Sequence, residues 1–568
     1  MHRTFETTTE RRQRTLDGQW AFLVDPDDEG REAGYHESFP TERSDRLAVP
    51  SSWNARTEYA DYVGPAWYRR TFTIREPGSV LLTFLGVAHE ATVYLDGEEI
   101  ADHLGGYTPI TALARDLDAG EHELVVRADN TRTETTLPHD GADWFPHGGI
   151  HREVVVERVP DVYVRDLAVE YDLYGDEAAV EAEVTLHNVG PKPAEPDLTV
   201  SVGDASVTES VEVYGMDAAT TTLALDVPDI DRWDPDDPTL YEVEARLSGE
   251  QADEREGETF ADDVRDRIGF REVVTAGREI LVNGDPVEIA GVNRHEDHPD
   301  WGSAQPLQIQ QRDLDLVRRA GCNAVRCSHY PNHPRFLDLC DEAGVLVIEE
   351  IPMWQVDASS VTAAQERAQR ALVEMLERDR HHPAIFAWSL SNECDNEEPT
   401  VAEATRQLKW TADGVDGSRL VTVASNTDWE GETDEAFDMC DFLSVNAYWG
   451  WYRDGDWGAF LDGVADEYGE KPVVVTEFGA GAVPGDRSHE ARKWSESYQA
   501  DLLGDCVDLF RAHDAVAGFT VWQFCDTLTN PDRAMSRPRT RNNKGILDEY
   551  RRPKEAYRTL RDRLADDT

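Results

Sequence analysis

The sequence predicts a three-domain protein with a jelly-roll sandwich, an immunoglobulin-like β-sandwich and a C-terminal (β/α)8 barrel. Two observations support the sandwiches: residues 1–160 and 161–262 both carry short runs in which apolar and polar residues alternate, as half-buried antiparallel strands do. A third observation supports the barrel. From residue 263 to 568, apolar runs alternate with amphipathic stretches of helical period, which is typical of parallel strands connected by helices.

The first predicted domain, residues 1–160, begins with recurrent strand-like segments. Alternating runs at 66–74 and 79–84 are bounded by turn residues, and Asp96-Gly97 is a strong signal for a tight hairpin. Many short strands separated by such turns favour a jelly roll.

The second predicted domain, residues 161–262, has its clearest alternation at 178–186. Its length of about 100 residues is typical of an immunoglobulin-like sandwich. A Pro- and Asp-rich stretch at 229–238 is predicted to be a loop inside it.

The third predicted domain, residues 263–568, contains eight apolar β-like runs. Helical patterns between them cover 308–320, 362–380 and 490–509. In a (β/α)8 barrel the carboxyl ends of the strands carry the active site, so polar residues that end these runs are the candidates for chemistry. The runs begin near Val287, Asn323, Val345, Ala384, Leu420, Phe442, Val473 and Gly518.

The composition is extremely acidic. The chain carries 114 acidic and 55 basic residues for a net charge of −59, and only six of the basic residues are lysines. Self-repulsion at this charge disfavours a compact fold at low salt, and molar salt screens it within about 3 Å. The pattern resembles that of halophile proteins, the alternative being a merely acidic mesophilic protein. It argues against nucleic acid and anionic membranes as partners.

Nothing in the sequence indicates secretion or membrane insertion. The N-terminus lacks a charged segment followed by an apolar one, and no apolar run is of transmembrane length, so we expect a cytoplasmic protein. The seven cysteines form no CxxC pattern and predict no disulfide framework. Cys394 adjoins a candidate catalytic residue, but a small buried side chain is the usual role of a free cysteine.

Two glutamates end apolar runs of the predicted barrel. Glu393 closes the run 384–393 on the fourth strand, and Glu477 closes the run 472–477 on the seventh. Glutamates at strand ends are often solvated or cap helices. Two of them at the same barrel mouth are, however, the carboxyl pair that glycoside hydrolysis requires.

Four longer motifs occur in order along the barrel, at 291–297, 326–331, 388–393 and 476–479. Together with the order of the three domains, they resemble glycoside hydrolase family 2, which includes β-galactosidases, β-mannosidases and β-glucuronidases. The resemblance implies that Glu393 is the general acid/base and Glu477 the nucleophile of a retaining mechanism.

The resemblance also implies a set of sugar-binding residues. Asn392 is expected to bind the 2-hydroxyl, and Trp522 to form an apolar platform under the sugar, with core packing as its alternative. In the aromatic segment 446–452, Tyr448 is expected to orient the nucleophile. The remaining candidates at the mouth are Asn446, Tyr452 and His295, with His329 nearby. We expect no metal and no cofactor, because the histidine spacing does not support metal ligation.

Residues near the C-terminus bear on the identity of the sugar. The segment 541–546 resembles the Asn-x-Lys motif of β-glucuronidases, which implies that Asn542 and Lys544 hold the C6 carboxylate; a solvated basic turn is the alternative. The segment 143–152 resembles the part of the first domain that reaches that pocket, so Asp143 is expected to accept hydrogen bonds from sugar hydroxyls. The sequence departs from the family pattern at Pro538, where an arginine is usual.

Arg537 or Arg539 is expected to replace that arginine, and of the two we predict that Arg539 binds the substrate. A second departure is Gln523, where the family has an asparagine after the eighth-strand tryptophan. The sequence thus predicts a retaining β-glucuronidase acting on a small or oligosaccharide β-glucuronide, with assembly into a homo-oligomer left open. A β-galactosidase or β-galacturonidase of the same family is the nearest alternative. A non-catalytic carbohydrate-binding protein is the alternative from another class.

Overall fold

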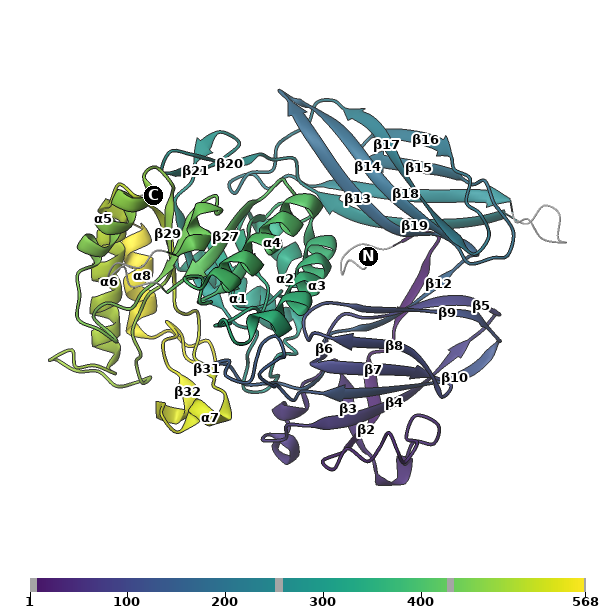
Figure 1. Ribbon diagram of the computed structural model, residues 1–568, viewed down its shortest axis with the longest axis horizontal. Coiled ribbons are helices and arrows are strands. Elements are labelled where there is room, and N and C mark those ends of the chain that lie inside the picture. The colour runs from purple at the N-terminus through teal and green to yellow at the C-terminus, as the bar shows by residue number, and fades with distance from the viewer. Residues whose placement is uncertain (1–7, 251–258, 427–433, 566–568) are drawn as a thin grey trace.

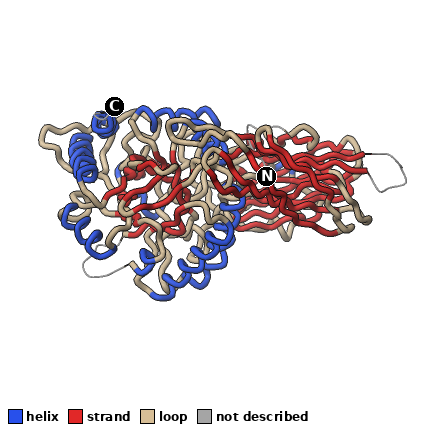
Figure 2. Tube along the Cα trace, turned by 90° about the horizontal axis from the view of Figure 1, so that it is seen from above, coloured by secondary structure: helices blue, strands red, loops and turns tan. Residues whose placement is uncertain are grey.

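The computed structural model describes residues 8–250, 259–426 and 434–565 and contains the three predicted domains. Both sandwiches lie on one side of the barrel, and the helices surround the barrel at the other end of the molecule (Figures 1 and 2). No helix among the described residues combines the length and the apolar character needed to cross a membrane.

The first domain packs a four-stranded sheet, β1-β12-β5-β9, against a six-stranded sheet, β3-β2-β4-β10-β7-β8. Its apolar residues alternate inward to form a common core that includes the fully buried Trp20, Trp53 and Tyr68. The strands are β1 (Arg12–Thr15), β2 (Gly18–Val24), β3 (Asp45–Val49), β4 (Pro65–Ile74), β5 (Gly78–Phe84), β6 (Val87–Ala88), β7 (Glu90–Leu95), β8 (Glu98–Leu104), β9 (Ile110–Leu117), β10 (Gly120–Asp129), β11 (Gly149–Ile150) and β12 (Val154–Val159).

The second domain is a sandwich of the sheets β13-β14-β17 and β16-β15-β18-β19. β14 shows the predicted alternation, with every second side chain from Ala178 to Leu186 in the core. The predicted boundary at residue 262 falls inside β19, which pairs with β18, so the sandwich extends to Ile268. The strands are β13 (Val162–Tyr174), β14 (Glu177–Asn188), β15 (Asp197–Val202), β16 (Ala205–Ser210), β17 (Asp217–Val227), β18 (Tyr241–Glu250) and β19 (Thr259–Ile268).

The barrel closes from eight parallel strands in sequence order. Every residue of these strands is buried except the first residue of β30, as expected for strands with apolar neighbours on both faces. They are β23 (Ile289–Arg294), β24 (Ala324–Cys327), β25 (Leu346–Glu350), β26 (Ile385–Asn392), β27 (Leu420–Ser425), β28 (Leu443–Asn446), β29 (Val473–Glu477) and β30 (Val516–Val521). A small sheet of β20 (Val273–Ala276), β21 (Glu279–Val282) and β22 (Asp285–Pro286) precedes the barrel, and β31 (Thr527–Leu528) pairs with β32 (Arg541–Asn542) at its mouth.

The barrel helices begin where the sequence supplies caps. The His333 side chain accepts from Arg335 N–H ahead of α2, which ends at Ala343 and is followed by the C-cap Gly344 with φ 67°. The Ser495 side chain accepts from Tyr498 N–H, so α6 begins at Glu496, six residues later than predicted. The helices are α1 (Leu307–Arg319), α2 (Pro334–Ala343), α3 (Val361–Asp379), α4 (Pro399–Val415), α5 (Trp457–Tyr468), α6 (Glu496–Ala512), α7 (Pro531–Ala534) and α8 (Glu555–Leu564).

The segment that leads into β11 and β12 joins the first domain to the mouth of the barrel. Arg152 donates to Glu296 at 3.0 Å, and His147 contacts Asp297 at 3.0 Å. All four side chains are largely buried. A β-bridge between Trp144 and Thr529 continues the junction. This docking places residues of the first domain beside the carboxyl ends of the barrel strands.

Candidate active site

A cavity of about 170 Å³ opens at the carboxyl ends of the barrel strands and brings together most of the predicted site residues. Its wall includes Asp143, His295, Asn392, Glu393, Tyr448, Tyr452, Glu477, Trp522, Asn542 and Lys544. A neighbouring cavity of about 270 Å³ shares Glu393, Tyr448 and Tyr452 and is also lined by Asn446. Arg539 lines neither cavity.

Glu477 is the last residue of β29 and is held on both carboxylate oxygens. Arg326 donates to Oε1 at 2.9 Å, and the Tyr448 hydroxyl donates to Oε2 at 2.6 Å. Burial, followed by the nearby Glu477 charge, raises the pKa of Tyr448 well above its ordinary value, so the phenol keeps the proton it donates. The Glu477 carboxylate is therefore oriented by one cation and one neutral hydroxyl.

Arg326, on β24, connects the buried polar groups beneath the cavity. Its Nη2 donates to Glu350 at 2.7 Å and to Asn392 Oδ1 at 2.7 Å. Burial alone would raise the pKa of Glu350, but the Arg326 charge and hydrogen bonds from His329 and Ser389 bring it below its ordinary value. A buried Arg326 thus faces two carboxylates, Glu350 and Glu477.

Glu393 follows β26 with φ 50°, a left-handed conformation that is uncommon outside glycine. Gln355 donates to its Oε2 at 2.8 Å and Asn446 to its Oε1 at 3.0 Å. Burial, and then the charge of Glu477, raises the pKa of Glu393, while these two hydrogen bonds act in the opposite direction. The two glutamates therefore have different environments, which is the pattern expected of an acid beside a carboxylate.

Asn392 has an amide of fixed orientation. Its Oδ1 accepts hydrogen bonds from Arg326 and, at 3.0 Å, from Asn446. Its buried Nδ2 has no hydrogen-bond partner among the described residues. Because Asn392 lines the cavity, this donor is suited to a ligand hydroxyl.

Trp522 forms the floor with two histidines. His329 stacks on Trp522 with ring centroids 5.0 Å apart, and His295 meets the indole edge-on at 5.4 Å. Burial, followed by the neighbouring His329, lowers the pKa of His295 well below its ordinary value. His295 is thus a neutral residue that contacts the Tyr330 hydroxyl at 3.2 Å.

The part of the wall formed by Asp143, Arg537, Asn542 and Lys544, which we call the basic wall, joins the first domain to the C-terminal segment. Asp143 accepts from Arg537 at 2.8 Å and from Asn542 at 3.2 Å. Lys544 donates to the Tyr452 hydroxyl at 2.6 Å and lies over the rings of Tyr452 and Tyr448, 4.8 and 5.1 Å from their centroids. Lys544 is buried, and among the described residues it forms no ion pair with a carboxylate, so its ammonium group can receive an anionic ligand group.

Arg539 does not belong to the basic wall. Its guanidinium lies 3.4 Å from Asp526 and pairs with Glu549. Arg539 has φ 61° inside a short 3-10 turn, and this left-handed backbone directs its side chain elsewhere than that of Arg537. Substrate binding by Arg539 stays a prediction; of the two arginines, Arg537 is the one that lines the cavity.

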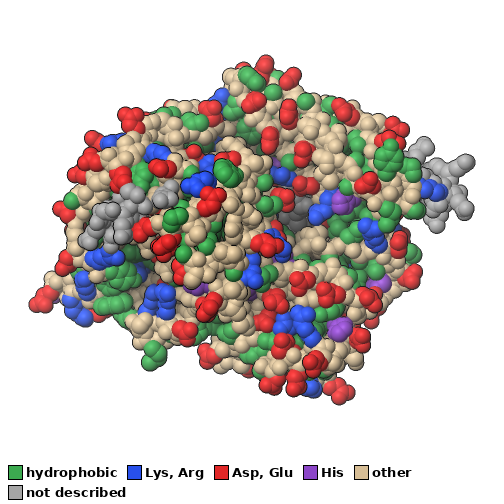
Figure 3. Space-filling view, viewed as in Figure 1, with side chains coloured by type: hydrophobic (Ala, Val, Ile, Leu, Met, Phe, Trp, Pro, Cys, Tyr) green, Lys and Arg blue, Asp and Glu red, His purple; other side chains and the backbone are tan. Residues whose placement is uncertain are grey.

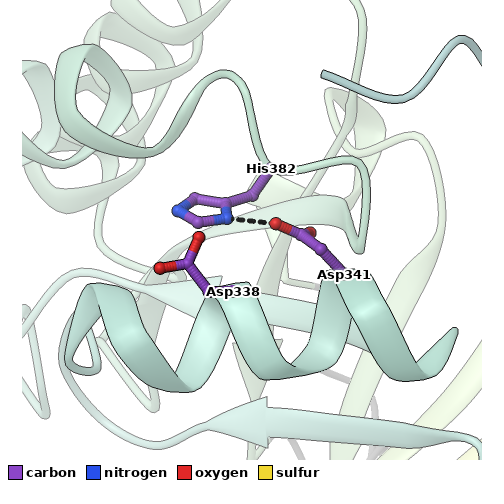
Figure 4. A group of neighbouring side chains, drawn as sticks. All are labelled: Asp338, Asp341 and His382. Atoms are coloured by element: carbon purple, nitrogen blue, oxygen red, sulfur yellow. Dashed lines mark hydrogen bonds and ion pairs between the residues drawn. The ribbon is translucent and has the colours of Figure 1, made fainter. Parts of the chain in front are cut away.

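A separate cluster of potential metal ligands lies at the opposite end of the barrel. Asp338 and Asp341 on α2 face His382, which precedes β26 (Figure 4). Asp341 and His382 are hydrogen-bonded at 2.5 Å, and Asp338 accepts from Arg267 of the second domain at 3.2 Å. These contacts make the cluster part of the junction between two domains rather than of the cavity.

Several residues that line the cavity or lie beneath it were not predicted as site residues from the sequence. Arg326 carried a detectable signal, since it is a charged residue within an apolar strand and within a motif. Trp144, Trp354 and Gln355 lie on loops and Arg533 lies in the short helix α7, and only the fold brings them to the cavity.

Comparison with known proteins gives three family matches. Residues 273–566 match the description "Glycosyl hydrolases family 2, TIM barrel domain", residues 162–271 match "Glycosyl hydrolases family 2", and residues 13–160 match its sugar binding domain. Among solved structures, a β-galacturonidase from Eisenbergiella tayi is 32% identical with a TM-score of 0.91, covering 99% of both chains. A β-glucuronidase from Ruminococcus gnavus is 29% identical with a TM-score of 0.85, covering 98% of both. Among curated proteins, a β-glucuronidase from Paenibacillus borealis is 28% identical, covering 98% of this chain and 97% of its own.

Proposed function

Because the chain belongs to glycoside hydrolase family 2 and is a glycoside hydrolase, we propose that it is a retaining β-glucuronidase in which Glu477 is the nucleophile and Glu393 the acid/base. The observation that carries this proposal is that these two glutamates share one cavity with a buried lysine, Lys544, which forms no ion pair with a carboxylate of the described part of the chain.

In the first step, the Glu477 carboxylate attacks the anomeric carbon while the bond to the leaving oxygen breaks. Glu393, whose pKa is raised by burial and by Glu477, holds a proton and gives it to that oxygen. Arg326 and Tyr448 keep the Glu477 oxygens oriented toward the sugar. Asn392 Nδ2 is available for the 2-hydroxyl, a contact that strengthens in the transition state.

In the second step, water replaces Glu477 at the anomeric carbon. The esterified Glu477 no longer carries a negative charge, so the pKa of Glu393 falls and Glu393 accepts the proton of the attacking water. The bond from the sugar to Glu477 breaks and the carboxylate is restored. The two inversions give net retention of configuration.

The basic wall supports a uronic acid as the sugar. Lys544 and Asn542 face the cavity beside Arg537, which takes the place of the arginine that the sequence lacks at Pro538. In the absence of substrate Asp143 accepts from Arg537 and Asn542 and keeps these donors oriented. A C6 carboxylate placed there gains charge-assisted hydrogen bonds that a neutral hexose cannot form.

A β-galacturonidase is the second candidate, and one observation favours it. The Eisenbergiella tayi β-galacturonidase is more similar to this chain, in identity and in TM-score, than the Ruminococcus gnavus β-glucuronidase. The two substrates share the C6 carboxylate and differ at C4, so the basic wall supports either one.

The test is a panel of 4-nitrophenyl β-glycosides carrying glucuronic acid, galacturonic acid, glucose and galactose. We expect kcat/KM to be highest on the glucuronide. A maximum on the galacturonide would establish the second candidate, and a maximum on a neutral glycoside would refute a uronidase of either kind. Turnover of none of the four, in a folded protein, would favour a carbohydrate-binding protein.

The surface supports a further proposal, that the protein works at high salt. Acidic side chains are spread over the whole visible face, and lysines and arginines lie among them (Figure 3). This distribution agrees with the net charge of −59 and with repulsion that is relieved by screening.

A further inference from the structure

The loop after β25 (Leu346–Glu350) places a polar side chain directly on the candidate acid/base. Gln355 Nε2 donates to Glu393 Oε2 at 2.8 Å. The Gln355 side chain is exposed on the cavity wall, whereas the other donor to Glu393, Asn446, is buried. Gln355 lies on a loop without periodicity and could not be selected from the sequence.

The backbone around Gln355 is fixed to the end of β26 (Ile385–Asn392). Asn392 N–H donates to Met353 O, and Gln355 N–H donates to Asn392 O, both at 2.8 Å. Gln355 has φ 46° and Glu393 has φ 50°, so two non-glycine residues in the left-handed region face each other across this contact. Such strained conformations concentrate at functional sites.

From this geometry we infer that Gln355 is a positioning residue for Glu393, holding the carboxyl group and favouring its ionised form in both steps of the reaction. An amide N–H can donate to a carboxylate oxygen but cannot accept the proton of a carboxylic acid. Its hydrogen bond is therefore stronger to the ionised form.

The proposed effect opposes the two largest influences on Glu393. Burial and the Glu477 charge favour the protonated acid, and the hydrogen bonds from Gln355 and Asn446 favour the carboxylate. Among the described residues, His329 beyond β24 (Ala324–Cys327) and Tyr448 beyond β28 (Leu443–Asn446) also interact electrostatically with Glu393. Tyr452 and Arg453 line a cavity that Glu393 shares. Since Glu393 must be an acid in the first step and a base in the second, an opposing donor keeps both forms accessible.

The inference rests on the proposed role of Glu393 and makes a specific claim about pH. Removing the donor raises the pKa of Glu393, so the alkaline limb of kcat/KM moves to higher pH. For an activated substrate whose second step limits kcat, the acid limb of kcat moves upward as well.

The experiment compares Gln355→Met, Gln355→Gly and Gln355→Glu with the parent enzyme on 4-nitrophenyl β-glucuronide. Methionine keeps the length without a donor, and glycine adopts φ 46° without strain, so a folding defect in one is controlled by the other. We expect the alkaline limb to move upward by about 0.5–1 pH unit in both, and further in Gln355→Glu, whose added negative charge disfavours the carboxylate.

A lower rate at every pH with an unmoved alkaline limb would reduce Gln355 to a structural residue and overturn the inference. A shift in Gln355→Glu alone would overturn it too, because charge rather than the hydrogen bond would then be responsible. Glu393→Gln separates this failure from that of the proposed function. If the parent's alkaline limb persists in Glu393→Gln, Glu393 is not the titrating acid, and the role on which the inference rests is refuted.

Discussion

Arg326 Nη1 donates to Glu477 Oε1 at 2.9 Å, while Nη2 of the same buried guanidinium donates to Glu350 Oε2 at 2.7 Å. One cation therefore serves two carboxylates, only one of which lines the cavity. The charge of Glu477 is therefore stabilised by a buried cation, Arg326, which lies below the cavity.

Replacing Arg326 by methionine leaves Glu350 and Glu477 buried without their cation. We expect the free energy of unfolding to fall by about 3–5 kcal/mol and kcat/KM to fall by about 100-fold or more. Arg326→Lys, which retains the charge without the fork of donors, should lie between the variant and the parent. Chemical denaturation and kinetics on one preparation measure both, and an unchanged kcat/KM would show that Arg326 supports only the fold.

Variants of the two glutamates should separate their roles. Glu477→Ala should abolish turnover, and added azide should restore product as the glycosyl azide of inverted configuration. Glu393→Ala should largely spare substrates with activated leaving groups, because these need little proton donation. Product configuration by NMR and rates across a leaving-group series provide the readout. Equal losses on good and poor leaving groups would contradict the acid/base role.

The basic wall should distinguish uronides from neutral glycosides. Lys544→Ala leaves the substrate carboxylate unpaired and should lower kcat/KM on the glucuronide by about 100- to 1000-fold, with a small change on the glucoside. Arg537→Ala should act in the same direction by about 10- to 100-fold. Arg539→Ala is the matched control, expected within about twofold of the parent. Parallel losses on both substrates would make Lys544 a support of the fold.

Acid should destabilise the protein through buried histidines. Burial lowers the pKa of both His89 and His151 to about 3, so each stays neutral in the folded state. An unfolded histidine binds a proton near pH 6.5, so stability is complete above that pH and is lost as the pH falls toward 3. At pH 5, each of these two histidines lowers the free energy of unfolding by about 2 kcal/mol relative to its value above pH 6.5. His151→Gln should reduce the difference in unfolding free energy between pH 8 and pH 5, and an unchanged difference would contradict this.

Salt should stabilise the fold, since the chain must confine 59 net negative charges. The unfolding midpoint is expected to rise between about 0.1 M and several molar KCl as screening increases. A midpoint independent of KCl would refute adaptation to salt.

The barrel could be predicted closely because its strands are continuous apolar runs. Predicted starts such as Leu420 and Val473 coincide with the observed ones, since burial on both faces leaves little choice of residue type. The start of α6 was less accurate, because helical periodicity continued through residues that precede the Ser495 cap. Domain boundaries are weak signals for the same reason: β19 continues past residue 262 without a change in composition.

The site was predictable where a residue ends a strand and not where it lies on a loop. Glu393 and Glu477 follow apolar runs, which placed them at one mouth. Arg537 and Arg539 are two positions apart in one turn and differ in their backbone dihedral angles. No local sequence pattern predicts this difference. Gln355 is placed only by its pairing with Asn392, which no local reading of the sequence reveals.

The contacts of Asp143 also make catalytic activity dependent on the docking of the first domain. It belongs to the first domain, yet it accepts hydrogen bonds from Arg537 and Asn542 at the far end of the chain. The cavity is therefore complete only after two separately folded regions have docked. During refolding, the return of uronide hydrolysis should lag behind the return of barrel secondary structure. The time course of recovered activity would then report the rate at which the domains dock.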